Sequence, residues 1–232
     1  MKLISILLAL TALMQPAAPG FHQLTFPIPD RAPMPYAILV PRDYAARKPV
    51  PLVLALHPGG VRMPNYGGAF VQQIVATGLS DLHAIIVAPD CPTPAWTDPI
   101  AERAVIALVE RVLQDYAIDR RRVLVTGFSL GGRGTWFLSS RHADVFTAAI
   151  PMAGATADDP IESLATIPTY VIHSRDDQVV PFGPAERRVR ELEKLGRVIK
   201  FEALQDVTHF QMGGYVESLR RGGRWVAEQW KK

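Results

Sequence analysis

The chain has 232 residues, with 25 Lys and Arg against 22 Asp and Glu, a formal net charge of +3 and 48% hydrophobic residues. This length is sufficient for one domain with a substantial core. The nearly balanced charge, with no dense basic patch among aromatic residues, argues against a nucleic-acid-binding protein. A single cysteine, Cys91, excludes an intramolecular disulfide, and no Cys/His pair has zinc-ligand spacing, so we expect no metal site.

The N-terminus has the composition of a secretory signal peptide. Met1 and Lys2 give a basic start, an apolar run covers residues 3–14, and small residues lead to Gly20. The apolar run is too short to span a bilayer comfortably. We therefore predict a signal peptide over residues 1–20, a folded domain over 21–232, and export to the periplasm or the extracellular space without stable membrane insertion. A retained membrane anchor is the alternative.

Apolar runs and amphipathic segments alternate along the rest of the chain. Strands are predicted at residues 24–26, 36–40, 51–57, 84–88, 123–125, 146–151, 170–173 and 198–204, and helices at 69–77, 102–116, after 129, at 186–195 and at 215–230. The first two strands are predicted to be antiparallel edge strands. The nearly continuous apolar runs that follow are typical of parallel strands covered on both faces. The alternation predicts one doubly wound α/β domain, with a mostly parallel sheet flanked by helices.

Three local expectations accompany this fold. The basic run Asp-Arg-Arg-Arg at residues 119–122 is expected to form a solvated loop before a strand. Cys91, between Pro89 and Pro92 after an apolar strand, is expected to be a buried thiol. No long insertion follows the strand at 146–151, so we expect no large lid over the carboxyl ends of the strands.

The motif Gly127-x-Ser129-x-Gly131 lies between a predicted strand and a predicted helix. This context is typical of a tight turn that lifts a serine hydroxyl out of the sheet edge, and a Cβ at either glycine would collide with the neighbouring strand or helix. The unpaired amides at the start of the helix lie beside the hydroxyl, where an oxyanion would be stabilised. Ser129 is therefore the candidate nucleophile, and a glycine-rich turn without catalytic function is the alternative.

A serine hydroxyl needs a neighbouring base, and an imidazole base needs a carboxylate that fixes its tautomer. In α/β-hydrolases the three groups follow one another in the order Ser, acid, His. Of the six histidines, only His209 follows both Ser129 and the acids after the strand at 170–173, which makes it the candidate base. The candidate acids are Asp176 and Asp177, with Asp158 and Asp159 as a further alternative.

The segment from His173 to Pro181, His-Ser-Arg-Asp-Asp-Gln-Val-Val-Pro, resembles the His-Gly-x-x-Asp-x-x-Val-Pro element of the carboxylesterase and dienelactone-hydrolase-like branch of the α/β-hydrolases. Further similar segments lie, in the same order along the chain, at residues 52–57, 88–96, 118–123, 126–136 and 146–151. The chain is most similar to the small secreted esterases often described as predicted peptidase or phospholipase/carboxylesterase. This resemblance implies that Asp177 is the catalytic acid, with Ser174 in place of the usual glycine.

The resemblance also implies an oxyanion hole made of two backbone amides. One belongs to Leu130, directly after the nucleophile, and the other to the loop after the strand at 51–57. This chain has His57-Pro58 where the family usually has His-Gly. Because proline has no N–H, the second donor is Gly59 or Gly60, and the family register favours Gly59. His57 is then expected to organise the loop rather than to act as a base.

Loop residues near the serine turn are candidates for the substrate pocket. They are Gly60, Met63, Asn65, Tyr66, Trp96 and, on the helix after the serine, Trp136. Packing in the core or at the rim of the site is at least as good an explanation for each of the five residues other than Gly60.

These features predict a serine carboxylic-ester hydrolase that acts through an acyl-enzyme on small or carbohydrate-linked esters, without metal or organic cofactor. One alternative is a serine peptidase of the prolyl-oligopeptidase type, which normally carries an access-restricting domain that we do not expect here. Another is a catalytically inactive hydrolase-fold binding protein, against which the presence of a nucleophile, an acid and a base argues. The sequence does not specify an oligomeric state.

Overall fold

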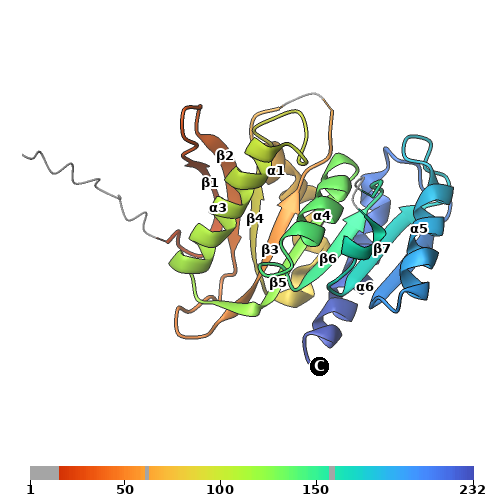
Figure 1. The fold of residues 1–232 in the computed structure, drawn as a ribbon. Coiled ribbons are helices and arrows are strands. Elements are labelled where there is room, and N and C mark those ends of the chain that lie inside the picture. The colour runs from red at the N-terminus through yellow and green to blue at the C-terminus, as the bar shows by residue number, and fades with distance from the viewer. Residues whose placement is uncertain (1–15, 61–62, 157–159) are drawn as a thin grey trace, which may run out of the picture.

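The computed structural model describes residues 16–60, 63–156 and 160–232, and an eight-stranded sheet runs through the molecule (Figure 1). The strands are β1 (Gly20–Phe26), β2 (Met34–Val40), β3 (Val50–Leu56), β4 (Ile85–Pro89), β5 (Ile118–Phe128), β6 (Ala148–Met152), β7 (Thr169–Ser174) and β8 (Ile199–Leu204). Their order across the sheet is β1-β2-β4-β3-β5-β6-β7-β8. β2 pairs antiparallel with β1 and β4, and the other neighbours are parallel. The predicted doubly wound, mostly parallel sheet is confirmed, although β2 is an internal strand and not an edge strand.

Helices cover both faces of the sheet. Figure 1 shows α3 (Pro99–Asp115), α4 (Leu130–Arg141) and α5 (Phe182–Lys194) on the near face. The other face carries α1 (Tyr66–Phe70), the π-helical turn η1 (Val71–Val75), α2 (Ala76–Gly78) and α6 (Val216–Gln229). Short 3-10 turns complete the described elements: η2 (Ser80–Leu82), η3 (Ile161–Ser163) and η4 (Met212–Tyr215).

The strand β3 shows why the molecule has a core on each side of the sheet. Side chains alternate along a strand, so Leu52, Leu54 and Leu56 pack with residues of α3 and α4. Val53 and Ala55 point the other way and pack with residues of η1 and α6. All five are 0% exposed, as expected of a strand covered on both faces.

The strand β5 begins earlier than the sequence predicts. The basic residues 120–122, expected in a solvated loop, belong to the strand, which starts at Ile118. Val50 of β3 pairs with Ile118 at this end of the sheet. The Nε of Arg122 donates to the Asp119 carboxylate at 2.9 Å. The loop prediction is therefore wrong. The backbone pairing extends past the apolar part of the strand, and the ion pair between Arg122 and Asp119 accommodates charge there.

Two predictions about the fold depend on residues outside the described part of the chain. Residues 1–15 of the predicted signal peptide are among them, and β1 begins at Gly20, where that peptide is predicted to end. The connection between β6 and β7, on which the expected absence of a large lid depends, contains residues 157–159, which are also outside. Within the described ranges, no helix has the length and apolar character that crossing a membrane requires.

Candidate active site

The turn after β5 holds Ser129 in a strained backbone conformation. Its φ of 55° and ψ of −112° lie in a region that residues with a Cβ rarely adopt, and α4 begins at the next residue. A Cβ added to Gly131 would lie 1.9 Å from the carbonyl oxygen of Leu56, and one added to Gly127 would lie 2.4 Å from the carbonyl oxygen of Gly131. Both glycines are therefore needed for the close approach of β3, β5 and α4 around the serine.

Ser129, His209 and Asp177 form a continuous chain of hydrogen bonds. The Oγ of Ser129 lies 2.8 Å from Nε2 of His209, and Nδ1 of His209 lies 2.7 Å from Oδ2 of Asp177. Because an ionised carboxylate only accepts, Nδ1 carries the proton, and Nε2 is left to accept from the serine hydroxyl. Asp177 is 8% exposed and His209 is 6% exposed, so both lie mostly away from solvent. This is the geometry that a general base requires.

The loop after β7 aims the Asp177 carboxylate at His209. Its Oδ1 accepts from the backbone amides of Val179 and Val180 at 2.9 and 2.7 Å, which leaves Oδ2 for the imidazole. Asp176 points elsewhere, since its Oδ2 accepts from a backbone amide in the loop after β8 at 2.7 Å. Of the two neighbouring acids, the structure therefore brings Asp177 to the histidine.

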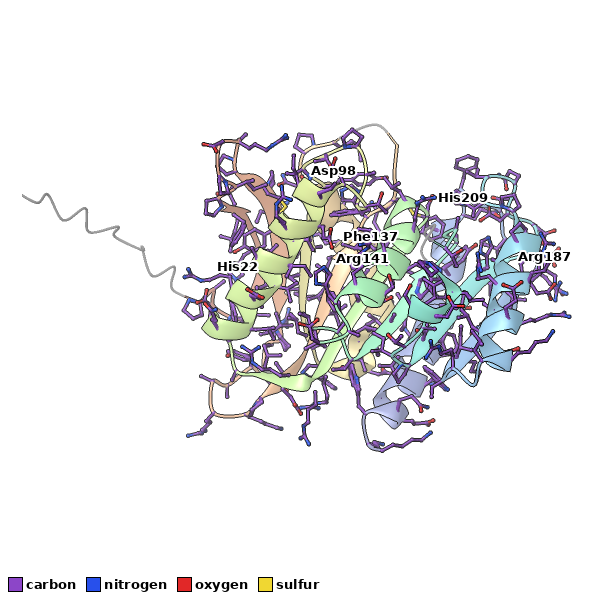
Figure 2. The ribbon with its side chains drawn as sticks, viewed as in Figure 1. His22, Asp98, Phe137, Arg141, Arg187 and His209 are labelled. Carbon is purple, nitrogen blue, oxygen red and sulfur yellow. The ribbon has the colours of Figure 1, made fainter. Side chains whose placement is uncertain are left out.

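His209 is held from several sides. Its backbone amide donates to the side chain of Gln178 at 3.2 Å, and its ring lies 5.1 Å from that of Phe128, centroid to centroid. Behind Phe128 lies Tyr215, which is fully buried. Burial, and then the nearby charge of Asp177, raise the pKa of the Tyr215 hydroxyl, which stays neutral. Figure 2 shows His209 above Phe137 and Arg141, two labelled residues of α4.

The loop after β3 lies against the first turn of α4. A Cβ added to Gly59 would lie 3.4 Å from the side chain of Leu130, so the two residues expected to supply the oxyanion amides are neighbours. Gly60 has a φ of 126°, a conformation that favours glycine. The loop therefore runs close beside the start of the helix, where backbone amides accumulate.

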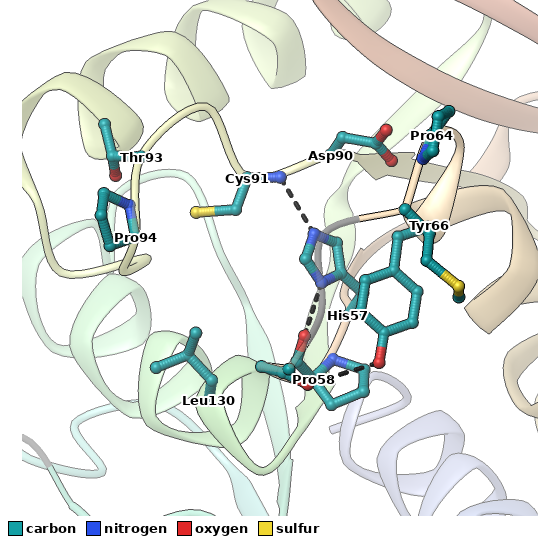
Figure 3. A pocket seen from close by; sticks show the side chains of 12 residues that line it. His57, Pro58, Pro64, Tyr66, Asp90, Cys91, Thr93, Pro94 and Leu130 are labelled. Atoms are coloured by element: carbon teal, nitrogen blue, oxygen red, sulfur yellow. Dashed lines mark hydrogen bonds between the residues drawn. The ribbon is translucent and has the colours of Figure 1, made fainter.

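His57 lies at the base of this loop and binds its backbone. Its Nδ1 lies 2.7 Å from the carbonyl oxygen of Pro58, and its Nε2 accepts from the amide of Cys91 at 3.0 Å (Figure 3). The ring of Tyr66 stacks on the imidazole at 4.5 Å between centroids. Both ring nitrogens therefore hydrogen-bond to backbone groups, as expected of a residue that organises the loop.

A cavity of about 310 Å³ opens beside the loops after β3 and β4 (Figure 3). Its lining consists of His57, Pro58, Gly59, Gly60, Met63, Pro64, Tyr66, Asp90, Cys91, Thr93, Pro94 and Leu130. Three of the expected pocket residues, Gly60, Met63 and Tyr66, are among them, whereas Asn65 is not. Because Gly59 and Leu130 form part of the wall, the cavity begins where the candidate oxyanion amides lie.

The structure favours packing for the two tryptophans among the pocket candidates, and the expectation of a buried Cys91 is wrong. Trp96 and Trp136 are each 1% exposed and do not line the cavity. The indole of Trp96 donates to the carbonyl oxygen of His57 at 3.0 Å, and Trp136 packs with residues of β7 and α5, so both are structural. Cys91 is only partly buried and lines the cavity, and its amide donates to Nε2 of His57.

Residues 94–214, just over half of the chain, match the family model described as "Dienelactone hydrolase family". The chain belongs to this family. The matched region contains Ser129, Asp177 and His209, the three residues that the hydrogen-bond chain joins. The loop after β3 precedes it.

Relatives of this dienelactone hydrolase family member include proteins named as esterases. "Probable feruloyl esterase C" from Aspergillus niger is 29% identical over 157 residues, which is 63% of this chain and 56% of that protein. A bifunctional acetylxylan esterase/xylanase from Neocallimastix patriciarum is 27% identical over 59% of this chain and 20% of that protein. The chain thus spans about half or less of the length of these relatives. A solved structure of a thermostable esterase superimposes with a TM-score of 0.75 at 26% identity, covering 90% of this chain and 62% of that one.

Two residues near the acid make contacts that the sequence pattern does not indicate. Gln178 binds the backbone of His209, and the side chain of His173 lies 3.6 Å from the Asp177 carboxylate. Both belong to the segment from His173 to Pro181, in which the family resemblance implies a role for Asp177 alone. The alternative acids at 158 and 159 lie outside the described residues.

Proposed function

We propose that this protein is a serine carboxylic-ester hydrolase that works through an acyl-enzyme. The observation that carries the proposal is the hydrogen-bond chain from Ser129 through His209 to Asp177, at 2.8 and 2.7 Å. The Nε2 atom is in position to take the serine proton as Oγ attacks an ester carbonyl. The esterase names of the relatives support ester hydrolysis as the reaction.

The reaction proceeds in two acyl-transfer steps. Ser129 Oγ bonds to the carbonyl carbon while its proton passes to His209, and the carbonyl oxygen becomes an oxyanion held by the amides of Leu130 and Gly59. The carbon–oxygen bond to the alcohol then breaks, and His209 gives its proton to the leaving oxygen. A water molecule repeats the sequence on the acyl-enzyme, releasing the acid and restoring the serine. Asp177 stabilises the imidazolium throughout, and no metal or organic cofactor takes part.

The acyl group is assigned to the cavity beside Leu130. The cavity starts at the candidate oxyanion amides, where the carbonyl must lie, and leads away under Tyr66 and Met63. Its volume of about 310 Å³ is at the lower end for ligand pockets and suits a small acyl group. The names of the relatives point to acyl groups between acetyl and feruloyl on a carbohydrate.

The alcohol is assigned to the opposite side of Ser129. His209 must hand a proton to the leaving oxygen, so the alcohol lies next to its ring. The following residue, Phe210, is 76% exposed with its ring 5.8 Å from that of His209, and Val179 on the acid loop is 50% exposed. An exposed aromatic ring at this point offers an apolar surface to one face of a sugar. This arrangement supports carbohydrate-linked esters as substrates.

We also propose that the protein is exported. The support is the basic start and the apolar run of residues 3–14, which resemble a secretory signal. Fractionation of an expressing cell, with a deletion of residues 2–20 as control, tests the proposal. The full chain is expected outside the cytoplasm and the deleted chain inside it.

The proposed activity is tested by hydrolysis of p-nitrophenyl acetate and butyrate, with Ser129→Ala as the matched variant. We expect the substitution to abolish hydrolysis and labelling by a fluorophosphonate, with an unchanged circular dichroism spectrum. Equal rates in the two proteins would show that Ser129 is not the nucleophile. A panel of acetylated sugars, feruloylated sugars and peptides then separates carbohydrate esterase from general esterase and from peptidase.

A further inference from the structure

His173 is a buried histidine that the proposed reaction does not use. It lies at the end of β7, its side chain is 0% exposed, and its Nε2 is 2.8 Å from the carbonyl oxygen of Val180. A carbonyl oxygen only accepts, so Nε2 must carry the hydrogen. The neutral ring then has its lone pair on Nδ1, which is buried and has no hydrogen-bond partner among the described residues. A buried imidazole held in one tautomer calls for an explanation.

The hydrogen bond from His173 closes the loop that carries the acid. Val180 is held twice, because His173 binds its carbonyl and its own amide donates to Oδ1 of Asp177 at 2.7 Å. The other oxygen of Asp177, Oδ2, lies 3.6 Å from Nε2 of His173 and 2.7 Å from Nδ1 of His209. A shift of the Val180 backbone would therefore rotate the Asp177 carboxylate away from His209.

The surroundings of His173 favour a neutral ring. Burial is the main cause that lowers its pKa, the Val180 carbonyl and the Asp177 charge oppose it in part, and His209 adds to the lowering. From α5, Phe182 meets the ring edge-on at 6.0 Å between centroids, and the guanidinium of Arg175 lies over the ring of Phe182, 4.6 Å from its centroid. A protonated ring would also carry a buried N–H on Nδ1 without a partner.

We propose that His173 is a positioning residue for the catalytic acid. Its Nε2–H fixes the carbonyl of Val180, and thereby the amide that turns the Asp177 carboxylate toward His209. The inference rests on the proposed function, since it concerns how the acid of that site is held. A misplacement of about 1 Å in a catalytic group can lower the rate by about 100-fold, so losing this hydrogen bond is expected to matter for chemistry more than for binding.

A matched pair of substitutions tests the inference. His173→Gln places an amide N–H near the position of Nε2, whereas His173→Asn places it near Nδ1, out of reach of Val180. We expect kcat within about threefold of wild type for Gln, and a loss of about 10- to 100-fold for Asn, with KM little changed in both. In the Asn variant the acid limb of kcat/KM should move to lower pH, because a misaligned Asp177 stabilises the imidazolium less.

Equal losses in the two variants with an unchanged pH profile would show that His173 only packs, and would overturn the proposal. A measurement on the wild-type protein needs no substitution: ¹⁵N chemical shifts at pH 7 should report a neutral His173 with the proton on Nε2. A proton on Nδ1, or a charged ring, would also overturn it. A Ser129→Ala variant that retains the activity of the wild-type protein would instead refute the proposed function. The two failures are therefore distinguishable.

Discussion

The strain at Ser129 predicts that removing its Cβ stabilises the fold. A residue with a Cβ at φ 55° and ψ −112° costs about 1–3 kcal/mol, and glycine at that position avoids most of it. Glycine also adds freedom to the unfolded chain, at a cost of about 0.5–1 kcal/mol relative to alanine. The balance makes Ser129→Gly more stable than Ser129→Ala by about 1 kcal/mol, or about 2–4 °C in Tm for a chain of this size.

Urea unfolding followed by circular dichroism measures this difference directly. Both variants lack the hydrogen bond from Ser129 to His209 and both are inactive, so their difference reports on the backbone alone. The control pair is Ser140→Ala and Ser140→Gly, within the regular helix α4, where glycine should be the less stable by about 1 kcal/mol. If glycine is less stable than alanine at position 129 by the same amount as at 140, the turn is not strained and the reasoning fails.

Three further predictions follow from the same contacts. Asp177→Asn places an amide where the base needs an acceptor and should lower kcat by about 10⁴-fold, whereas Asp176→Asn, assayed beside it, should change kcat less than threefold. Phe210→Ala should raise KM for acetylated sugars several-fold and leave ethyl acetate hydrolysis unchanged; equal effects on both esters would remove Phe210 from the alcohol site. Burial raises the pKa of Glu202. Hydrogen bonds to its carboxylate, above all from Arg221, outweigh this effect and leave the pKa below its ordinary value of 4.5. A carboxyl with a depressed folded pKa stabilises the fold above its unfolded pKa and loses that contribution as the pH falls through the folded value. Glu202→Gln should therefore unfold at lower urea concentration than wild type at pH 7, and this difference should narrow as the pH falls below 4.5 and through the folded pKa of Glu202. A difference independent of pH would contradict the assignment.

The features that could be predicted from sequence are those that local pattern and chain order determine. A serine between two close-packed glycines, after an apolar strand, has few structural alternatives, because the Cβ clash at Gly131 is a property of the turn itself. His209 could be selected because it alone follows both the serine and the acids after the strand at 170–173. The parallel sheet was predictable because doubly buried strands need continuous apolar runs.

The features that could not be predicted depend on contacts between distant segments. Residues 120–122 read as a loop because their charges suggest solvent, yet β5 can begin at Ile118 since Val50 is there to pair with it. Trp96 lies on a loop near the site, but its indole is buried in the core, where it donates to the carbonyl of His57, 39 residues away. Cys91 lines the cavity, and its amide donates to Nε2 of the same histidine. His57 thus contacts both Trp96 and Cys91, the two loop residues whose burial the sequence pattern does not determine.

The two sides of the proposed site are built from different parts of the sheet, which has a consequence for specificity. The cavity assigned to the acyl group is formed by the loops after β3 and β4 and the start of α4. The acid, the base and the exposed Phe210 come from the loops after β7 and β8. Because the catalytic hydrogen bonds do not pass through the cavity wall, substitutions at Met63 or Tyr66 can change the preferred acyl group while the alignment of His209 and Asp177 is retained. Substitutions of Asp177 change the rate for every ester alike, since each substrate uses the same base.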